Sequence, residues 1–299
     1  MRSGIVAGVS AYLLWGLLTV YWKLLHEFDP FDLIGWRIIT AAIVMVIGLS
    51  VSGRWGHLRP VLRDRRLLGR VVVAALLLTV NWTSYVWAVV NDHVIETALG
   101  YFMAPLGTIL IGVVVFGERL RNAQKIAVGL AVAAVIVLGV SYGAIPWLAL
   151  AIAVSWSLYG WLKKEVPLTP VESMSAESFV LVVPAIVVVA SLASQSDSVI
   201  SSASTGEMVL VALTGLATVI PLMLFARAAL RVPLTILGPL QYSVPTINFV
   251  LGWAVYGEEM PASRLAGFSL VWAGLLIVSL DTYRRSRSEA ASTREPVAA

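Results

Sequence analysis

The sequence predicts an all-α, polytopic membrane protein whose ten transmembrane helices form a 5+5 inverted repeat. Three observations lead to this fold class. The 299 residues are 59% apolar and 13% charged, whereas soluble domains have about 45–50% and about 25%. The chain also contains ten apolar runs of membrane-spanning length, and motifs of its first half return in its second half. Lipid, rather than water, is the solvent that suits such a composition.

Each apolar run is long enough to cross a bilayer as one helix. A hydrocarbon core of about 30 Å requires about 20 residues at a rise of 1.5 Å each. The first run continues from Gly4 to Leu25 without a signal-peptide cleavage site, so we expect it to be a retained span. The predicted spans are approximately residues 4–25, 31–52, 67–90, 94–117, 126–142, 146–163, 174–194, 207–229, 233–256 and 262–281.

The basic residues predict the orientation of these spans. If the N-terminus is cytoplasmic and ten spans alternate, only Lys23, Arg37 and Arg264 of the 21 basic residues lie outside or within the membrane. This bias follows the positive-inside rule and supports the count of ten spans. We therefore expect a multi-pass protein of the bacterial inner membrane with both termini in the cytoplasm.

The two halves repeat their proline, glycine and acidic positions at an offset of 140 residues. The segment APLGTILIGVVVFGERL of the first half corresponds to VPTINFVLGWAVYGEEM of the second. Because proline and glycine fix backbone geometry, their recurrence predicts duplicated structure. The equivalent pairs are Pro30 and Pro170, Asp32 and Glu172, Pro105 and Pro245, Gly112 and Gly252, Gly117 and Gly257, and Glu118 and Glu258.

This repeat predicts the domain organisation. We expect a first five-helix repeat at residues 1–143, a second at 144–282, and a disordered cytoplasmic tail at 283–299. An odd number of spans per repeat turns the second copy upside down relative to the first. Inverted repeats are typical of secondary transporters, in which the two halves move about a site near the midplane.

Two long motifs resemble a known family. They are NWTSYVWAVVNDHVIETALGYFMAPLGTILIGVVVFGERL at 81–120 and GLATVIPLMLFARAALRVPLTILGPLQYSVPTINFVLGWAVYGEE at 215–259. Both are similar to the repeat cores of the RarD-type permeases, EamA-domain members of the drug/metabolite transporter superfamily. YLLWGLLTVYWKLL and GWRII are similar to the first two helices of that family. The sequence departs from it at Thr19, where proline is usual, and at Thr40, where tryptophan is usual. The resemblance spans about residues 4–282 and implies a ten-helix permease.

The predicted function is secondary transport or facilitated diffusion of small organic metabolites or drugs. The chain has no cysteine and three scattered histidines, so no metal site or cofactor is expected. Two alternatives remain open, namely a non-transporting receptor or scaffold and, with less support, a membrane-embedded enzyme. The sequence contains no catalytic constellation that would favour an enzyme. The expected partners are an unidentified solute, the lipid bilayer, a coupling proton and a second copy in a homodimer, and no nucleic acid is expected.

Polar and aromatic residues inside the spans form the predicted solute site. An unsatisfied polar group in hydrocarbon is costly, so each must face a partner, water or solute. The candidates are Trp15, Asn81, Tyr85, Trp156, Tyr159, Thr218, Gln241 and Tyr242, with Trp82, Ser84 and Asn248 in the same groups. Two alternatives weigh against a cavity, since tryptophan and tyrosine also anchor helices at the membrane interface and asparagine also joins helices.

Charged residues near the span ends are candidates for gates. Arg37 and Glu177 occupy equivalent positions in the two repeats. We expect Arg37 to pair with Asp32 or Glu96, and Glu177 to pair with Arg227 or Arg231. Such pairs act as outer and inner gates, or as fixed structural pairs, and Glu177 is a candidate for proton coupling. Two prolines, Pro105 and Pro245, are expected to shape their helices by interrupting them.

Overall fold

The computed structural model describes residues 2–117, 119–229, 231–232 and 240–292, and all regular structure within these ranges is helical. The helices are α1 (Arg2–Lys23), α2 (Pro30–Ser52), the 3₁₀ helix η1 (Arg54–Leu58), α3 (Arg59–Arg63), α4 (Arg65–Val90), α5 (Val94–Phe116), α6 (Asn122–Tyr142), α7 (Trp147–Lys164), α8 (Pro170–Leu192), α9 (Val199–Ser202), α10 (Thr205–Ala229), α12 (Ser243–Val250), the π-helix η2 (Leu251–Val255) and α13 (Ala262–Ser292).

Eight of the described helices are long and apolar enough to cross a membrane. The ten spans predicted from the sequence are therefore not all reproduced by this criterion. The predicted span 146–163 is α7, which has 18 residues but carries three tryptophans and ends in two lysines. The predicted span 233–256 begins at residues 233–239, which lie outside the described ranges, and continues as the shorter apolar helix Ser243–Val255.

Local signals explain where several helices begin and end. Asp29 caps α2 by accepting hydrogen bonds from the backbone N–H groups of Phe31 and Asp32 at 2.8 and 3.0 Å. Thr169 and Glu172 form a capping box at the start of α8. Gly117 ends α5 with a φ of 63°, and the equivalent Gly257 follows η2 with a φ of 69°. Only glycine adopts this left-handed conformation at little cost.

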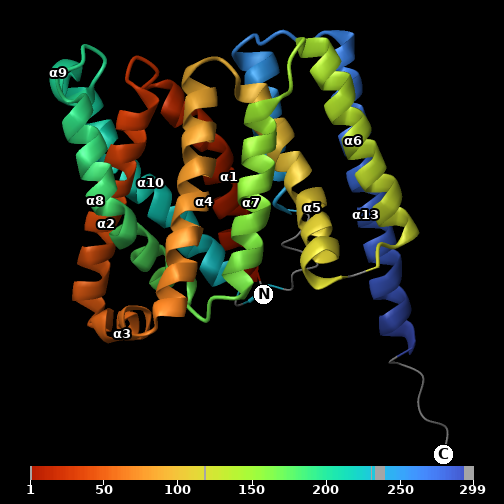
Figure 1. The fold of residues 1–299 in the computed structure, drawn as a ribbon, viewed down its shortest axis with the longest axis horizontal. Coiled ribbons are helices and arrows are strands. Elements are labelled where there is room, and N and C mark those ends of the chain that lie inside the picture. Colours follow the sequence, from red (N-terminus) through yellow and green to blue (C-terminus); the bar gives the residue numbers. More distant parts are fainter. Residues whose placement is uncertain (1, 118, 230, 233–239, 293–299) are drawn as a thin grey trace, which may run out of the picture.

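The helices of the two halves of the chain are interleaved, so the halves do not form two separate bundles. Helix α1 lies against α10 and α12, and the corresponding helix of the second half, α7, lies against α4 and α5. Helix α2 contacts α8 and α10, whereas α8 contacts α2 and α4. In Figure 1, α9 lies at the upper end and α3 at the lower end, while α6 and α13 run side by side at one edge. Every central helix therefore has neighbours from both halves.

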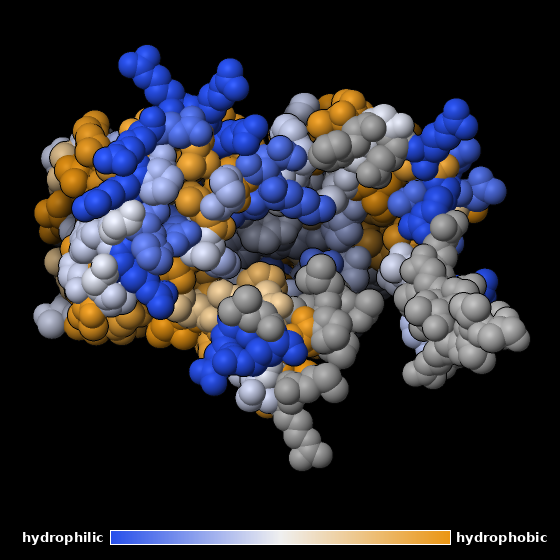
Figure 2. Space-filling model, turned by 90° about the horizontal axis from the view of Figure 1, so that it is seen from below, coloured by the Kyte–Doolittle hydropathy of each residue, from blue (hydrophilic) through white to orange (hydrophobic). Residues whose placement is uncertain are grey.

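The surface suits a lipid environment. Large apolar side chains such as Val114 and Val140 are about four-fifths exposed, which water would disfavour over so wide an area. Hydrophilic side chains gather instead on the face seen from below, which is hollowed near its centre (Figure 2). The helix α13 continues to Ser292, so residues 283–292 are helical where the sequence predicted a disordered tail. Residues 293–299 lie outside the described ranges.

Candidate functional site

A chain of buried hydrogen bonds joins the two halves at the centre of the molecule. Thr19 of α1 donates to Asn248 Oδ1 of α12 at 2.8 Å, so it accepts the 2.8 Å bond from the hydroxyl of Tyr85 of α4. Asn248 Nδ2 donates to Thr97 Oγ1 at 3.0 Å, and Thr97 donates to the Val94 carbonyl at 2.7 Å. Four helices from both halves are thus linked by side chains that are almost completely buried.

Arg37 of α2 is the central cation, and its surroundings differ from the prediction. Its side chain is only 4% exposed, and its Nε donates to Thr218 Oγ1 of α10 at 3.0 Å. The guanidinium lies 4.0 Å from the centre of the Trp82 ring and 5.4 Å from that of Trp22. Among the described residues no carboxylate lies within 4 Å of it, and its Nη1 has no hydrogen-bond partner.

Among the described residues, neither expected partner forms an ion pair with Arg37, so that expectation is wrong. Asp32 Oδ2 accepts a 2.7 Å hydrogen bond from the backbone N–H of Val199, at the start of α9. Glu96 is half-buried in the first turn of α5. Helix α2 is instead joined to α10 by polar groups on one face. In addition to the Arg37 bond, the hydroxyls of Thr40 and Thr214 lie 2.8 Å apart.

Asn81 lies at a three-helix contact. It is fully buried on α4, and its Oδ1 accepts a 3.0 Å hydrogen bond from the hydroxyl of Tyr101 on α5. Its Nδ2 donates to the Ile152 carbonyl and to Ser155 Oγ on α7, both at 3.2 Å. The amide therefore has protein partners for all its groups in this conformation, as expected of a residue that joins helices.

Glu177 forms an ion pair, but with a residue that the sequence did not single out. Its Oε1 lies 2.8 Å from Lys163 Nζ and accepts a 2.8 Å bond from Ser173 Oγ, while Oε2 accepts a 3.1 Å bond from the hydroxyl of Tyr159. The carboxylate is 1% exposed. The predicted partners Arg227 and Arg231 are both exposed, so Lys163 on α7 neutralises this carboxylate instead.

The remaining candidates form aromatic contacts or lie at the edge of the site. Trp15 packs against Phe225 of α10 with ring centres 5.7 Å apart. Trp156 stacks on Tyr159 at 5.7 Å and contacts Tyr101 edge-on at 6.0 Å. The ring of Tyr242 stacks on Phe102 at 6.4 Å, and Gln241 is exposed.

The two predicted helix-shaping prolines differ in their positions. Pro105 lies inside α5, where its ring removes one backbone hydrogen bond. Close to it, the carbonyl of Ala104 accepts a 2.7 Å hydrogen bond from Ser157 of α7. Pro245 is the third residue of α12, where a missing N–H costs no intrahelical bond. Of these two prolines, Pro105 therefore interrupts its helix and Pro245 does not.

At the upper end of the molecule in Figure 1, where α5 begins, the segment after η2 contacts α5 through Glu258, a residue of the repeated motif. Its carboxylate accepts hydrogen bonds from the backbone N–H groups of Val94 at 2.5 Å and Ile95 at 2.9 Å, the first residues of α5. Burial raises the pKa of the Glu258 carboxyl above its ordinary value of 4.5, and these two hydrogen bonds oppose the shift. Gly252 lies so close that a Cβ atom there would be 2.7 Å from Ile95 Cγ1.

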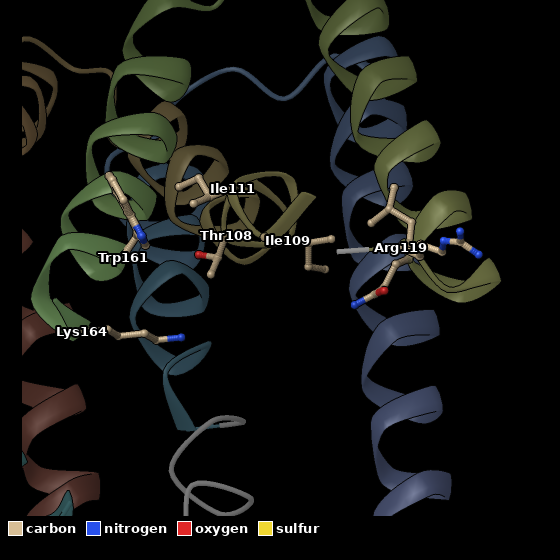
Figure 3. A pocket seen from close by; sticks show the side chains of 9 residues that line it. Thr108, Ile109, Ile111, Arg119, Trp161 and Lys164 are labelled. Carbon is tan, nitrogen blue, oxygen red and sulfur yellow. The ribbon is translucent and has the colours of Figure 1, made fainter. Parts of the chain in front are cut away.

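The lower end has a cavity at the corresponding place. Its volume is about 230 Å³, and it lies between α5, α7 and the start of α6. Figure 3 shows Lys164 and Trp161 on α7 at one side and Arg119 at the other, with Thr108 and Ile111 of α5 between them. The indole N–H of Trp161 is buried without a partner. Gly112, the repeat equivalent of Gly252, lines this cavity.

Comparison with known proteins gives consistent matches over almost the whole chain. The profile of the EamA-like transporter family matches residues 2–140 and, separately, residues 144–280. A protein named RarD from Streptomyces exfoliatus is 44% identical over 96% of this chain and 91% of its own length. An uncharacterised transporter, YojE of Bacillus subtilis strain 168, is 34% identical over 96% of this chain and 97% of its own. One crystal structure, at 20% identity, covers 95% of this chain and 99% of its own with a TM-score of 0.57, which indicates a shared fold.

Proposed function

Because this chain belongs to the EamA-like transporter family, we propose that it is a secondary transporter or facilitator of small organic metabolites or drugs. It is a multi-pass membrane protein, and its relatives come from bacteria, which places it in the bacterial inner membrane. The names of the relatives favour neither a receptor or scaffold nor an enzyme, and the Bacillus subtilis relative is called a transporter.

We propose a ten-helix arrangement of two inverted five-helix repeats, with α7 as the sixth span and the span 233–256 predicted from the sequence as the ninth. Two matches of one family profile, at 2–140 and 144–280, support the duplication. The exchange of acidic contacts supports the inversion. Asp32 of α2 bonds to the start of α9, while the equivalent Glu172 of α8 lies 2.8 Å from His57 Nδ1 in η1, near the opposite end of the molecule. The two repeats are then related by a rotation of roughly 180° about an axis in the membrane plane.

The observation that carries the transport proposal is the difference between two equivalent ends. At the upper end, Gly252 and Glu258 close against α5. At the lower end, Gly112 of the same repeated motif lines a cavity. The distribution of basic residues makes the upper end periplasmic and the lower end cytoplasmic, with both termini in the cytoplasm. An inverted pair of halves that closes one end and opens the other is the arrangement alternating access requires.

The solute path in this proposal runs from the lower cavity to the polar centre between the halves. Tyr85, Thr218 and the aromatic walls Trp15 and Trp156 line the central part, and Gln241 and Tyr242, which precede α12, complete the proposed path. Glu177 is the proposed coupling group, because its carboxylate is buried between Lys163 and Tyr159 and can exchange a proton when these contacts separate. A homodimer remains a prediction.

A metabolite screen tests the transport proposal. The protein is produced in a bacterial strain that lacks its own homologue, and intracellular and extracellular metabolites are compared with those of the empty strain by mass spectrometry. We expect at least one small organic solute to accumulate on one side only when the protein is present. Equal pools in both strains, at verified membrane abundance, would support the receptor or scaffold alternative.

A further inference from the structure

We propose that the solute is an organic anion whose carboxylate binds Arg37, an inference that rests on the proposed transport function and defines its substrate class. Arginine presents five N–H donors and remains charged in proteins. Here Nε is used by Thr218, while Nη1 is buried and has no partner. The guanidinium thus has an unused hydrogen-bond donor on a side chain that is only 4% exposed.

A buried cation without a counterion is costly, and proteins ordinarily pair or hydrogen-bond such groups. The neighbouring acid does not fill this place. Asp32 lies five residues earlier on α2, which a rise of 1.5 Å per residue sets about 7.5 Å nearer the upper end. Its Oδ2 is held by Val199, and its distance from the guanidinium exceeds 4 Å. Oδ1 of Asp32 also has no hydrogen-bond partner. Asp32 therefore does not act as the counterion of Arg37, and the positive charge of Arg37 is available to a ligand.

The surroundings of Arg37 indicate the rest of the ligand. Trp82 stacks against the guanidinium at 4.0 Å, and Trp22 lies at 5.4 Å. Thr218 fixes the plane of the guanidinium from the second half. A guanidinium with a fixed orientation can donate two hydrogen bonds to the two oxygens of a carboxylate. The aromatic rings can pack against an apolar or aromatic part of the same ligand.

The lower cavity supports the same sign of charge independently. Its described lining contains two cations, Arg119 and Lys164, and no acidic residue, and Glu118 lies outside the described part. A cleft lined by one sign of charge raises the local concentration of the opposite ion. An anion is therefore attracted to the cytoplasmic mouth and recognised at Arg37.

Binding of [¹⁴C]benzoate to the purified full-length protein in lipid nanodiscs tests this inference, with the neutral isostere benzamide as the matched competitor. We expect benzoate to bind and benzamide to compete at least about tenfold more weakly than unlabelled benzoate. Arg37→Gln should weaken benzoate binding about tenfold or more, and Arg37→Lys should weaken it less. The control Arg227→Gln, which removes an exposed arginine on α10, should leave binding unchanged.

Each outcome has a distinct meaning. No benzoate binding, equal competition by benzamide, or unchanged binding by a folded Arg37→Gln protein would overturn the inference. The benzamide comparison on the unaltered protein remains decisive even if both Arg37 variants fail to fold. Asp32→Asn keeps an acceptor for Val199 and should bind benzoate at least as tightly as the unaltered protein. Loss of benzoate binding by this variant would show that Asp32 is needed at the site and would contradict an Arg37 charge that is free for the solute. If the metabolite screen finds only neutral or cationic solutes, the transporter stands and the anion site falls. If benzoate binds through Arg37 but no solute moves, the anion site stands and the proposed transport function falls.

Discussion

Thr19 shows how a single hydroxyl couples the two halves. It lies in the C-terminal part of α1, where the resembling family usually has proline, and it bonds both Tyr85 and Asn248. Thr40, the other departure, likewise bonds Thr214 of α10 across the halves. Both threonines therefore provide polar contacts that proline and tryptophan cannot form in this way.

Removing the Thr19 hydroxyl should destabilise the protein. Thr19→Val preserves the shape of the side chain but leaves the Tyr85 hydroxyl and the Asn248 carbonyl oxygen without their partner. We expect a loss of about 1–3 kcal/mol in the free energy of unfolding, measured by denaturant or thermal unfolding in detergent. The matched control is Thr246→Val on α12, whose exposed hydroxyl bonds only the carbonyl of Tyr242 in its own chain segment. Equal stability of both variants would contradict the coupling.

The two amides predicted from the sequence should now behave differently. Asn81→Ala removes three hydrogen bonds between α4, α5 and α7, so we expect thermal stability and membrane abundance to fall together with transport. Gln241→Ala alters an exposed side chain in the turn before α12, so we expect reduced transport at normal abundance. Parallel transport and thermal-stability measurements on both variants check this. A fully stable Asn81→Ala protein without transport would restore Asn81 as a solute contact.

The sequence identified several buried polar residues but not their partners. Arg37, Asn81 and Glu177 were expected to need partners because polar groups in apolar runs are costly, and all three are buried. Their partners depend on how each helix is rotated and on which neighbours it has. The pairing of Glu177 with Lys163 required knowing that the end of α7 lies against α8, which the 140-residue offset does not reveal. A polar residue within a predicted span, such as Thr19, was a signal that could have been used.

At the scale of elements, the cap that Glu258 places on α5 should hold the upper end closed. Glu258→Ala leaves the N–H groups of Val94 and Ile95 without their charged acceptor, so we expect the upper end to open more often. The chain has no cysteine, so a single Ile95→Cys reports opening through its rate of labelling by a membrane-impermeant maleimide. We expect labelling several-fold faster in the Glu258→Ala background. Glu259→Ala, at the exposed neighbouring position, is the control, and equal rates in the two backgrounds would argue against a closing role for Glu258.

The elements themselves were largely predictable. Eight apolar runs correspond to helices that are long and apolar enough to cross a membrane, because a continuous apolar run of about 20 residues is a strong signal. Helix α7 falls short because tryptophan and lysine lower its hydropathy, although it packs against α4 and α5 like the long helices. The short helices η1, α3 and α9 were missed. They lie in connecting segments and are defined by local hydrogen bonds rather than by apolar length.

At the scale of the whole molecule, the orientation in the membrane remains to be tested. We expect both termini to be cytoplasmic, since this places all but three basic residues inside. A reporter active only in the periplasm should be silent when fused after Ala299 and active when inserted near Ser201, in α9 at the upper end of Figure 1. A cytoplasm-active reporter at the same two sites is the control and should show the reverse. A periplasmic signal at Ala299 would contradict this topology.

The duplication could be predicted from the sequence, but the conformation could not. Gly112 and Gly252 occupy the same position in the repeated motif, and nothing in their sequence neighbourhoods says which end is closed. In the structure one packs against Ile95 and the other lines a cavity. Closure at the Gly252 end and closure at the Gly112 end require different contacts between the halves. Because the motif is repeated, the sequence alone does not favour one end over the other.

A reversible bridge across the upper end tests most directly whether solute passes between the two halves. His93→Cys and Glu259→Cys flank the hydrogen bonds between Glu258 and α5 and leave them intact. A disulfide-containing bis-maleimide then links the first repeat to the second, with closure verified by mass spectrometry and each single-cysteine variant treated as a control. We expect movement of the solutes found in the metabolite screen to stop on cross-linking and to return when a reductant opens the linker. Undiminished transport by the fully bridged protein would contradict alternating access between these halves.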